Sequence, residues 1–173
     1  AQARISLIYG GAKVGLMGVL ADQMLENNGH VIGIMPKSLV NVEIAHQHLT
    51  ELHVVDSMHE RKALIAEWAD GFIMLPGGPG SLDEFFEMLT WAQLGYHSKP
   101  CSILNICNYY DHLLKFLDQA VEQGFMKQVY RDMIIVENSS ERLLQKMNNY
   151  QAPAEKKWID NSKLNKNVES VTI

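Results

Sequence analysis

The sequence lacks the features that mark membrane, secreted and nucleic-acid-binding proteins. None of its apolar runs approaches the roughly 18 residues of a membrane-spanning helix. Its 173 residues include two cysteines, Cys101 and Cys107, without CxxC spacing, which disfavours a disulfide framework and a zinc site. We interpret both as buried thiols in a reducing cytoplasm. The net charge of −5 argues against a nucleic-acid partner, because nucleic acids favour basic patches.

The histidines of the sequence also lack the spacing that metal ligands usually have. Among the seven histidines only His46 and His48 form a close pair, which is a weak signal, so we expect no metal site. In contrast, 47% of the residues are hydrophobic and 20% are charged, which is typical of a globular chain. The length suits a single domain with a sizeable core. We expect that domain over residues 1–150 and a polar tail over residues 151–173.

Short, apolar, β-branched segments alternate with helical patterns. The expected strands are continuous apolar runs, as in parallel strands covered on both faces. The alternation predicts right-handed βαβ units and an α/β fold, with a doubly wound, Rossmann-like parallel sheet between two layers of helices. The expected strands cover residues 5–9, 31–35, 52–55, 71–75, 101–106 and 133–136, and the expected helices cover residues 15–28, 58–69, 82–94, 110–123 and 140–149.

Two glycine-rich segments follow expected strand ends, where ligands of open α/β sheets bind. They are "YGGAKVGLMG", with Gly10 and Gly11, and "PGGPGS" over residues 76–81. Neither fits a familiar nucleotide fingerprint, since Leu16 replaces the Walker A lysine and Asp83 replaces the third dinucleotide-binding glycine. Glycine N–H groups at a helix start still suit a phosphate. A tight turn, or close packing alone, is the alternative in both places.

The helix expected after "PGGPGS" begins with acidic residues. Ser81 and Glu84 have the spacing of a capping box, and local chemistry favours a cap over catalysis. However, Glu87, Met88 and Trp91 share a helix face with Glu84. A carboxylate on a partly apolar face at a strand's carboxyl end is also a candidate site, so both interpretations stay open. Apolar residues on more than one side of this helix predict a homodimer.

An arginine falls on the expected inward face of the preceding helix. In "SMHERKALIAEW", the apolar stripe of Met58, Ile65 and Trp68 includes Arg61. Burying Arg61 unpaired costs several kcal/mol, so it needs a partner, either a structural acid or a bound anion. Ser57 and Glu60 form a second capping box. His59 contacts a ligand or caps the helix, and the sequence does not separate these roles.

Together, "MHERK" over residues 58–62 and "PGGPGSLDE" over residues 76–84 resemble the Lonely Guy family, whose signature pairs M-x-x-R-K with PGGxGTxxE. The resemblance spans about residues 7–144. Two positions depart from the family pattern: Ser81 replaces a threonine and keeps its hydroxyl, and Ala12 replaces a third glycine. Family members also open with a further strand and a Gly-Ser-Ser turn, so we expect a strand–helix unit to be missing before Ala1.

The resemblance implies a Rossmann-like nucleotide-binding domain, a homodimer and no redox cofactor. The implied activity is hydrolysis of the N-glycosidic bond of a nucleoside 5′-monophosphate, which releases ribose 5-phosphate and a base, typically N6-prenylated adenine. Two alternatives remain: a non-catalytic nucleotide or cofactor carrier, and an amino-acid decarboxylase, which an older label of related proteins suggests. The second is disfavoured because no lysine has a recognisable Schiff-base context.

The residues implied for the site lie on both motifs. Arg61 and Glu84 match the catalytic pair of the family. The first glycine turn and His59 add further candidates from the residues themselves. The implied substrate-binding residues are Glu43, Met58, Arg61, Lys62, Gly77, Gly78, Pro79, Gly80, Ser81, Leu82, Asp83, Glu84 and Thr90, and the further candidates are Gly10, Gly11 and His59.

Overall fold

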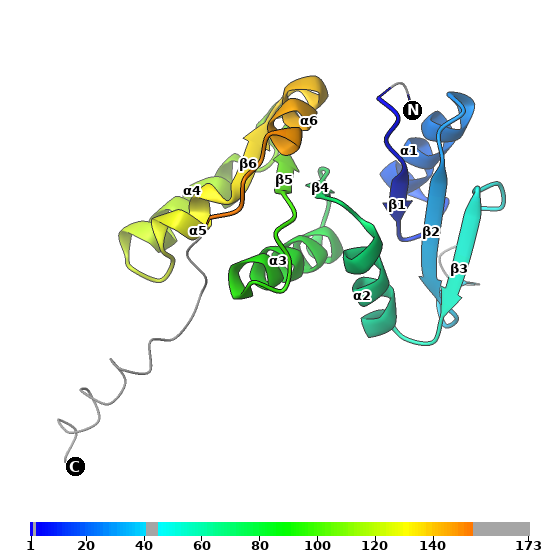
Figure 1. The fold of residues 1–173 in the computed structure, drawn as a ribbon, viewed down its shortest axis with the longest axis horizontal. Coiled ribbons are helices and arrows are strands. Elements are labelled where there is room, and N and C mark those ends of the chain that lie inside the picture. The colour runs from blue at the N-terminus through cyan, green and yellow to red at the C-terminus, as the bar shows by residue number, and fades with distance from the viewer. Residues whose placement is uncertain (2, 41–44, 154–173) are drawn as a thin grey trace, which may run out of the picture. The chain divides into compact units, whose positions relative to one another are not determined.

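The computed structural model describes residues 1, 3–40 and 45–153 (Figure 1). The chain divides into two compact units, Ala1–Ala69 and Asp70–Ile173. Each unit contains a sheet of three parallel strands with helices packed against it.

In the first unit the strand order is β1-β2-β3. Gly33 of the central strand pairs with Tyr9 on one side and with Leu52 on the other. Helix α1 packs mainly against β1 and β2 and buries Ala21 beside Tyr9. Only the last residue of β3, Val55, is buried, so the prediction of strands covered on both faces is wrong for this outer strand. The elements are β1 (Leu7–Tyr9), α1 (Gly15–Glu26), β2 (Val31–Pro36), β3 (Glu51–Val55) and α2 (Met58–Trp68).

In the second unit the strand order is β4-β5-β6. Cys101 at the start of the central strand pairs with Phe72 and with Ile134. Helix α3 packs against β4 and β5, and its Met88 and Leu89 are almost fully buried. The elements are β4 (Phe72–Met74), α3 (Pro79–Leu94), β5 (Cys101–Leu104), the 3₁₀ turn η1 (Ile106–Asn108), α4 (Asp111–Glu122), α5 (Gln128–Asp132), β6 (Ile134–Glu137) and α6 (Ser140–Asn148).

The parallel strands flanked by helices confirm the predicted Rossmann-like α/β class. Every predicted strand and helix is present with shifted ends, whereas η1 and α5 are additional. Among the described residues, none of the helices has the length and apolarity that crossing a membrane requires. Most of the predicted tail, from residue 154 onward, lies outside the described residues.

The two cysteines differ. Cys101 in β5 is buried, and burial raises the pKa of its thiol to about 12. Cys107 is exposed and adopts a left-handed backbone conformation, with φ of 52°. The prediction that both thiols are buried is therefore wrong for Cys107, because β5 ends at Leu104 and leaves Cys107 in a surface turn.

Candidate active site

Arg61 lies buried beside the end of β1. Its side chain is on the inward face of α2, as predicted, and the residue is 9% exposed. The guanidinium lies against Gly10, where an added Cβ would overlap Nη2 and sit 3.0 Å from Cζ. Among the described residues, no group forms a hydrogen bond with the buried Arg61 Nε. Because burying part of a guanidinium unpaired is costly, this position suits a bound anion.

The start of α2 is fixed by the predicted cap. Ser57 Oγ accepts a hydrogen bond from the Glu60 N–H at 3.1 Å. The Glu60 carboxylate accepts from the N–H of Asp56 at 2.8 Å, one residue before the position that the capping box predicts. His59 is exposed, and since Ser57 supplies the cap, His59 does not.

The apolar stripe of α2 is narrower than the sequence indicated. Ile65 is 6% exposed, but Met58 and Trp68 are 41% and 38% exposed. Met58 and Trp68 are the first and last residues of the helix. Lys62, the residue after Arg61, is half-buried.

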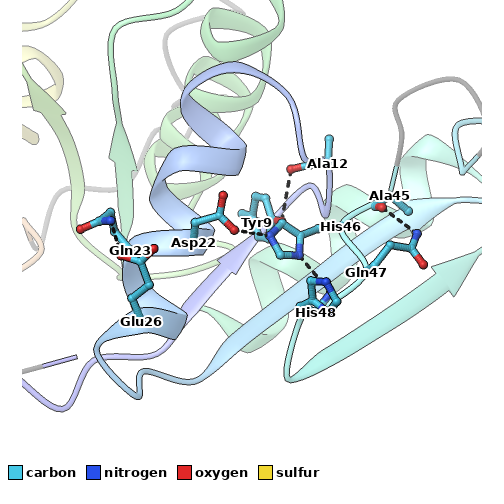
Figure 2. A network of polar contacts seen from close by, with 9 residues as sticks. All are labelled: Tyr9, Ala12, Asp22, Gln23, Glu26, Ala45, His46, Gln47 and His48. Carbon is cyan, nitrogen blue, oxygen red and sulfur yellow. Dashed lines mark hydrogen bonds and ion pairs between the residues drawn. The ribbon is translucent and has the colours of Figure 1, made fainter.

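Polar contacts hold the glycine turn that follows β1 (Figure 2). The His46 N–H donates to the Gly11 carbonyl at 2.9 Å, and the Tyr9 hydroxyl donates to the Ala12 carbonyl at 3.2 Å. Ala12 also pairs with Ala45 in an isolated antiparallel bridge. Gly11 has a φ of 82°, which glycine adopts without strain. Three backbone and side-chain contacts thus hold the residues directly after Gly10.

His46 forms the centre of this network (Figure 2). Its side chain is fully buried, with Nε2 2.9 Å from an Asp22 carboxylate oxygen, while its Nδ1 accepts the His48 N–H at 3.2 Å. Since Nδ1 accepts, the ring proton is on Nε2, and a neutral imidazole donates to Asp22. Burial, with a smaller contribution from the Asp22 charge, raises the pKa of Tyr9 to about 12, so its hydroxyl stays a donor.

The second glycine turn begins α3 earlier than predicted. Pro79 is the first helical residue and Gly78 is the N-cap, with no side-chain hydrogen bond at the cap. The predicted capping box of Ser81 and Glu84 is therefore wrong: Ser81 lies inside the first turn, and Glu84 lies in the second. Proline fits the first helical position because its φ is preset and it needs no N–H partner, so the helix starts there.

The turn leaves room for a ligand. A Cβ added at Gly78 or Gly80 would meet no atom within 4 Å, whereas one at Gly77 would overlap Ser81 Oγ. The first N–H groups of an α-helix have no intrahelical acceptor, and the helix dipole favours an anion there. The turn is therefore open at Gly78 and Gly80 and filled by the Ser81 hydroxyl at Gly77, and phosphate binding there remains a prediction.

Further along α3, three of the predicted site residues line one groove, and Glu84 is not among its lining residues. A shallow groove of about 400 Å³ runs past Leu82, Asp83 and Thr90. The Thr90 hydroxyl donates to the carbonyl of Phe86 at 2.7 Å, so it is engaged within its own helix. A larger groove of about 610 Å³, between β6 and α6, contains none of the predicted site residues.

The predicted site residues fall on both units. The first unit brings Arg61 against Gly10, and the second brings Ser81 against Gly77. The pairing of Arg61 with Glu84 remains a prediction. Glu43 lies outside the described residues. Within the described parts of the chain, no group of three or more His, Cys, Asp or Glu residues could hold a metal ion.

Comparison with known proteins identifies the family. A family model described as "Possible lysine decarboxylase" matches residues 17–147. A cytokinin riboside 5′-monophosphate phosphoribohydrolase of Rhodococcoides fascians is 51% identical over 137 residues, which are 79% of this chain and 69% of the relative. A protein of Arabidopsis thaliana with the same activity in its name is 44% identical over 146 residues, which are 84% of this chain and 68% of the relative. The chain belongs to the Lonely Guy family.

The Lonely Guy match includes both motifs that predicted it. Residues 17–147 contain "MHERK" and "PGGPGSLDE", while Gly10 and Gly11 precede the matched range. Sequence reasoning missed the polar partners that hold the two glycine turns. His46 and Asp22 are 24 positions apart, and no local pattern links them. Asp22 lies within α1 and His46 in the connection between β2 and β3, so their contact depends on the tertiary fold.

Proposed function

We propose that this Lonely Guy protein hydrolyses the N-glycosidic bond of N6-modified adenosine 5′-monophosphates and of AMP, giving the free base and ribose 5-phosphate. The observation that carries the proposal is the 51% identity with a relative named for this activity. The geometry supports it in each unit. Arg61 offers a buried guanidinium beside Gly10, and an uncapped glycine turn opens α3.

In the proposed complex, the turn over residues 77–81 binds the 5′-phosphate through backbone N–H groups, with Lys62 as a further cation. Open space at Gly78 and Gly80 lets phosphate oxygens approach the backbone closely. The phosphate is remote from the bond that breaks. Its binding energy therefore fixes the position of the sugar and lowers the entropic part of the barrier.

In the proposed reaction, positive charge develops on the ribose as the bond from its anomeric carbon to the base nitrogen breaks. A water oxygen then bonds to the anomeric carbon. The leaving base takes up the electron pair of the broken bond, and a proton from the water balances its charge. Glu84, as a carboxylate, stabilises the cationic sugar and orients the water. Arg61 anchors a ligand oxygen or holds that carboxylate.

The test is base release from AMP and isopentenyladenosine monophosphate, measured by HPLC. We expect Glu84→Gln to bind nucleotide and to lose about 10²-fold or more in kcat, as removal of a catalytic carboxylate typically does. Glu122→Gln, at an exposed position in α4, is the matched control and should keep the wild-type rate. Near-wild-type turnover of Glu84→Gln would exclude the role given to Glu84.

A non-catalytic nucleotide carrier is the second candidate, because the anion-binding turn alone would serve it. Binding of AMP without base release by the wild-type protein would favour the carrier. We also propose a homodimer in the cytoplasm. Exposed Leu94 and Tyr96 at the end of α3 are available for subunit contact, and the exposed free thiol of Cys107 suits a reducing compartment. Light scattering after size-exclusion chromatography measures the oligomer.

A further inference from the structure

Two adjacent tyrosines bind two carbonyls of the turn that precedes α3. The Tyr110 hydroxyl donates to the Leu75 carbonyl at 2.8 Å, and the Tyr109 hydroxyl donates to the Gly77 carbonyl at 3.1 Å. The two rings are packed edge to face, with centroids 4.8 Å apart and an interplanar angle of 89°. Tyr110 is 4% exposed, whereas Tyr109 is 56% exposed. Both hydroxyls thus reach one short segment of backbone from the loop after β5.

That loop is itself held firmly. Asn105 is buried, accepts the Tyr110 N–H at 2.7 Å and donates to Asp111 at 2.8 Å. Cys107 and Asn108 both adopt left-handed conformations, with φ of 52° and 60°. Such conformations are costly for residues other than glycine and persist only where their surroundings enforce them. The loop therefore presents the tyrosines in a fixed position.

The two hydrogen bonds act on different kinds of peptide. In a trans peptide the carbonyl and the N–H lie in one plane and point in opposite directions. The Gly77 carbonyl shares its peptide with the Gly78 N–H, so a hydrogen bond that fixes the carbonyl also fixes the direction of the N–H. The Leu75 carbonyl shares its peptide with Pro76, which has no N–H. Tyr109 therefore orients a donor, and Tyr110 orients none.

We propose that Tyr109 is a positioning residue of the phosphate site: its hydroxyl holds the peptide between Gly77 and Gly78 so that the Gly78 N–H faces a bound phosphate monoester. The inference rests on the proposed function for the identity of this ligand. Glycine on both sides makes rotation of that peptide easy. Without the Tyr109 hydroxyl, the peptide can turn and present its carbonyl oxygen to the anion.

The neighbouring tyrosine supplies a control of the same chemistry. Burial raises the pKa of Tyr110, so its hydroxyl stays a donor to the Leu75 carbonyl. Removing the Tyr110 hydroxyl loosens the turn but takes no aimed donor from the phosphate. We expect Tyr110→Phe to lower the unfolding temperature and to leave phosphate affinity unchanged.

The experiment compares wild type, Tyr109→Phe and Tyr110→Phe by calorimetric titration with AMP and by competition with adenosine. For Tyr109→Phe, we expect the Kd of AMP to rise about tenfold, because the variant loses a hydrogen bond to a charged group. The Kd of adenosine, which has no phosphate, should stay within about twofold of the wild-type value. In turnover assays, KM for AMP should rise while kcat changes little. Equal losses of AMP affinity in both variants, or none in Tyr109→Phe, would overturn the inference.

A spectroscopic readout separates positioning from direct contact with the ligand. In the ligand-free protein, the Gly78 amide resonance should move in Tyr109→Phe and stay in place in Tyr110→Phe. An unmoved Gly78 amide in Tyr109→Phe would overturn the inference. So would a wild-type protein that binds neither AMP nor inorganic phosphate. If the wild type binds AMP and releases no base, the proposed function fails, and the comparison of Kd values still decides the role of Tyr109.

Discussion

The contact between Gly10 and Arg61 allows a test of Arg61 that leaves the arginine in place. Gly10 is not among the glycines with positive φ, so Gly10→Ala is compatible with the backbone. The new Cβ would lie 3.0 Å from Arg61 Cζ. Because non-bonded heavy atoms pack at about 3.5–4.0 Å and Nη2 lies closer to the new Cβ than Cζ does, the guanidinium must move by about 1 Å or more.

This displacement should affect turnover far more than stability. The end of an arginine side chain can shift by rotation about its bonds, so we expect the free energy of unfolding to change by about 1 kcal/mol or less. If Arg61 acts on the substrate, a displacement of about 1 Å should lower kcat by about 10²-fold. The assay is base release from isopentenyladenosine monophosphate, together with urea unfolding of the same samples.

The double variant Gly10→Ala with Arg61→Ala is the control. Once the arginine has been removed, Gly10→Ala should cost nothing further, so the double variant should match Arg61→Ala. A folded Gly10→Ala protein with near-wild-type kcat would refute the importance of the observed position of Arg61. A double variant much slower than Arg61→Ala would show that Gly10 acts by another route.

Other predictions concern histidine and cysteine. Burial lowers the pKa of His97 below 6.5; the hydrogen bond to the Met88 carbonyl opposes this shift and the charge of Lys99 adds to it. As the pH drops below about 6.5, the unfolded state therefore binds a proton at this residue before the folded state does, and the free energy of unfolding decreases. In urea unfolding, His97→Gln should weaken this dependence, whereas the exposed His112→Gln should not. His46→Ala should cost about 2–3 kcal/mol by the same measurement, because it removes a fully buried side chain together with its hydrogen bonds to Asp22 and to the His48 N–H, and a cost below about 1 kcal/mol would contradict the network. In the native protein a thiol reagent should modify Cys107 alone, and rapid labelling of Cys101 would contradict its burial.

Local patterns predicted the features that depend on a few consecutive residues. The inward orientation of Arg61 follows from helical periodicity, and Ser57 caps α2 as its spacing indicated. The same motif failed at Ser81, since Pro79 offered a competing helix start. Residue spacing alone does not show whether α3 starts at Pro79 or after Ser81, because the path of the chain out of β4 decides this.

Contacts between distant segments could not be predicted in this way. Tyr109 and Gly77 are 32 positions apart, and their hydrogen bond depends on the adjacent, parallel placement of β4 and β5. The left-handed backbone conformations of Cys107 and Asn108 could not be predicted either, because neither residue type requires them. The sequence marked the glycine turn as a candidate site, but it held no sign of the side chains that fix its peptides.

The turn before α3 combines the most and the least flexible residue types. Pro76 and Pro79 enclose Gly77 and Gly78, and each proline restricts φ to about −65°. The glycines allow a ligand to come close, while the prolines and Tyr109 limit the conformations that the unoccupied turn samples. Little conformational entropy is therefore left to lose when an anion binds, so more of the energy of each N–H contact is retained as affinity.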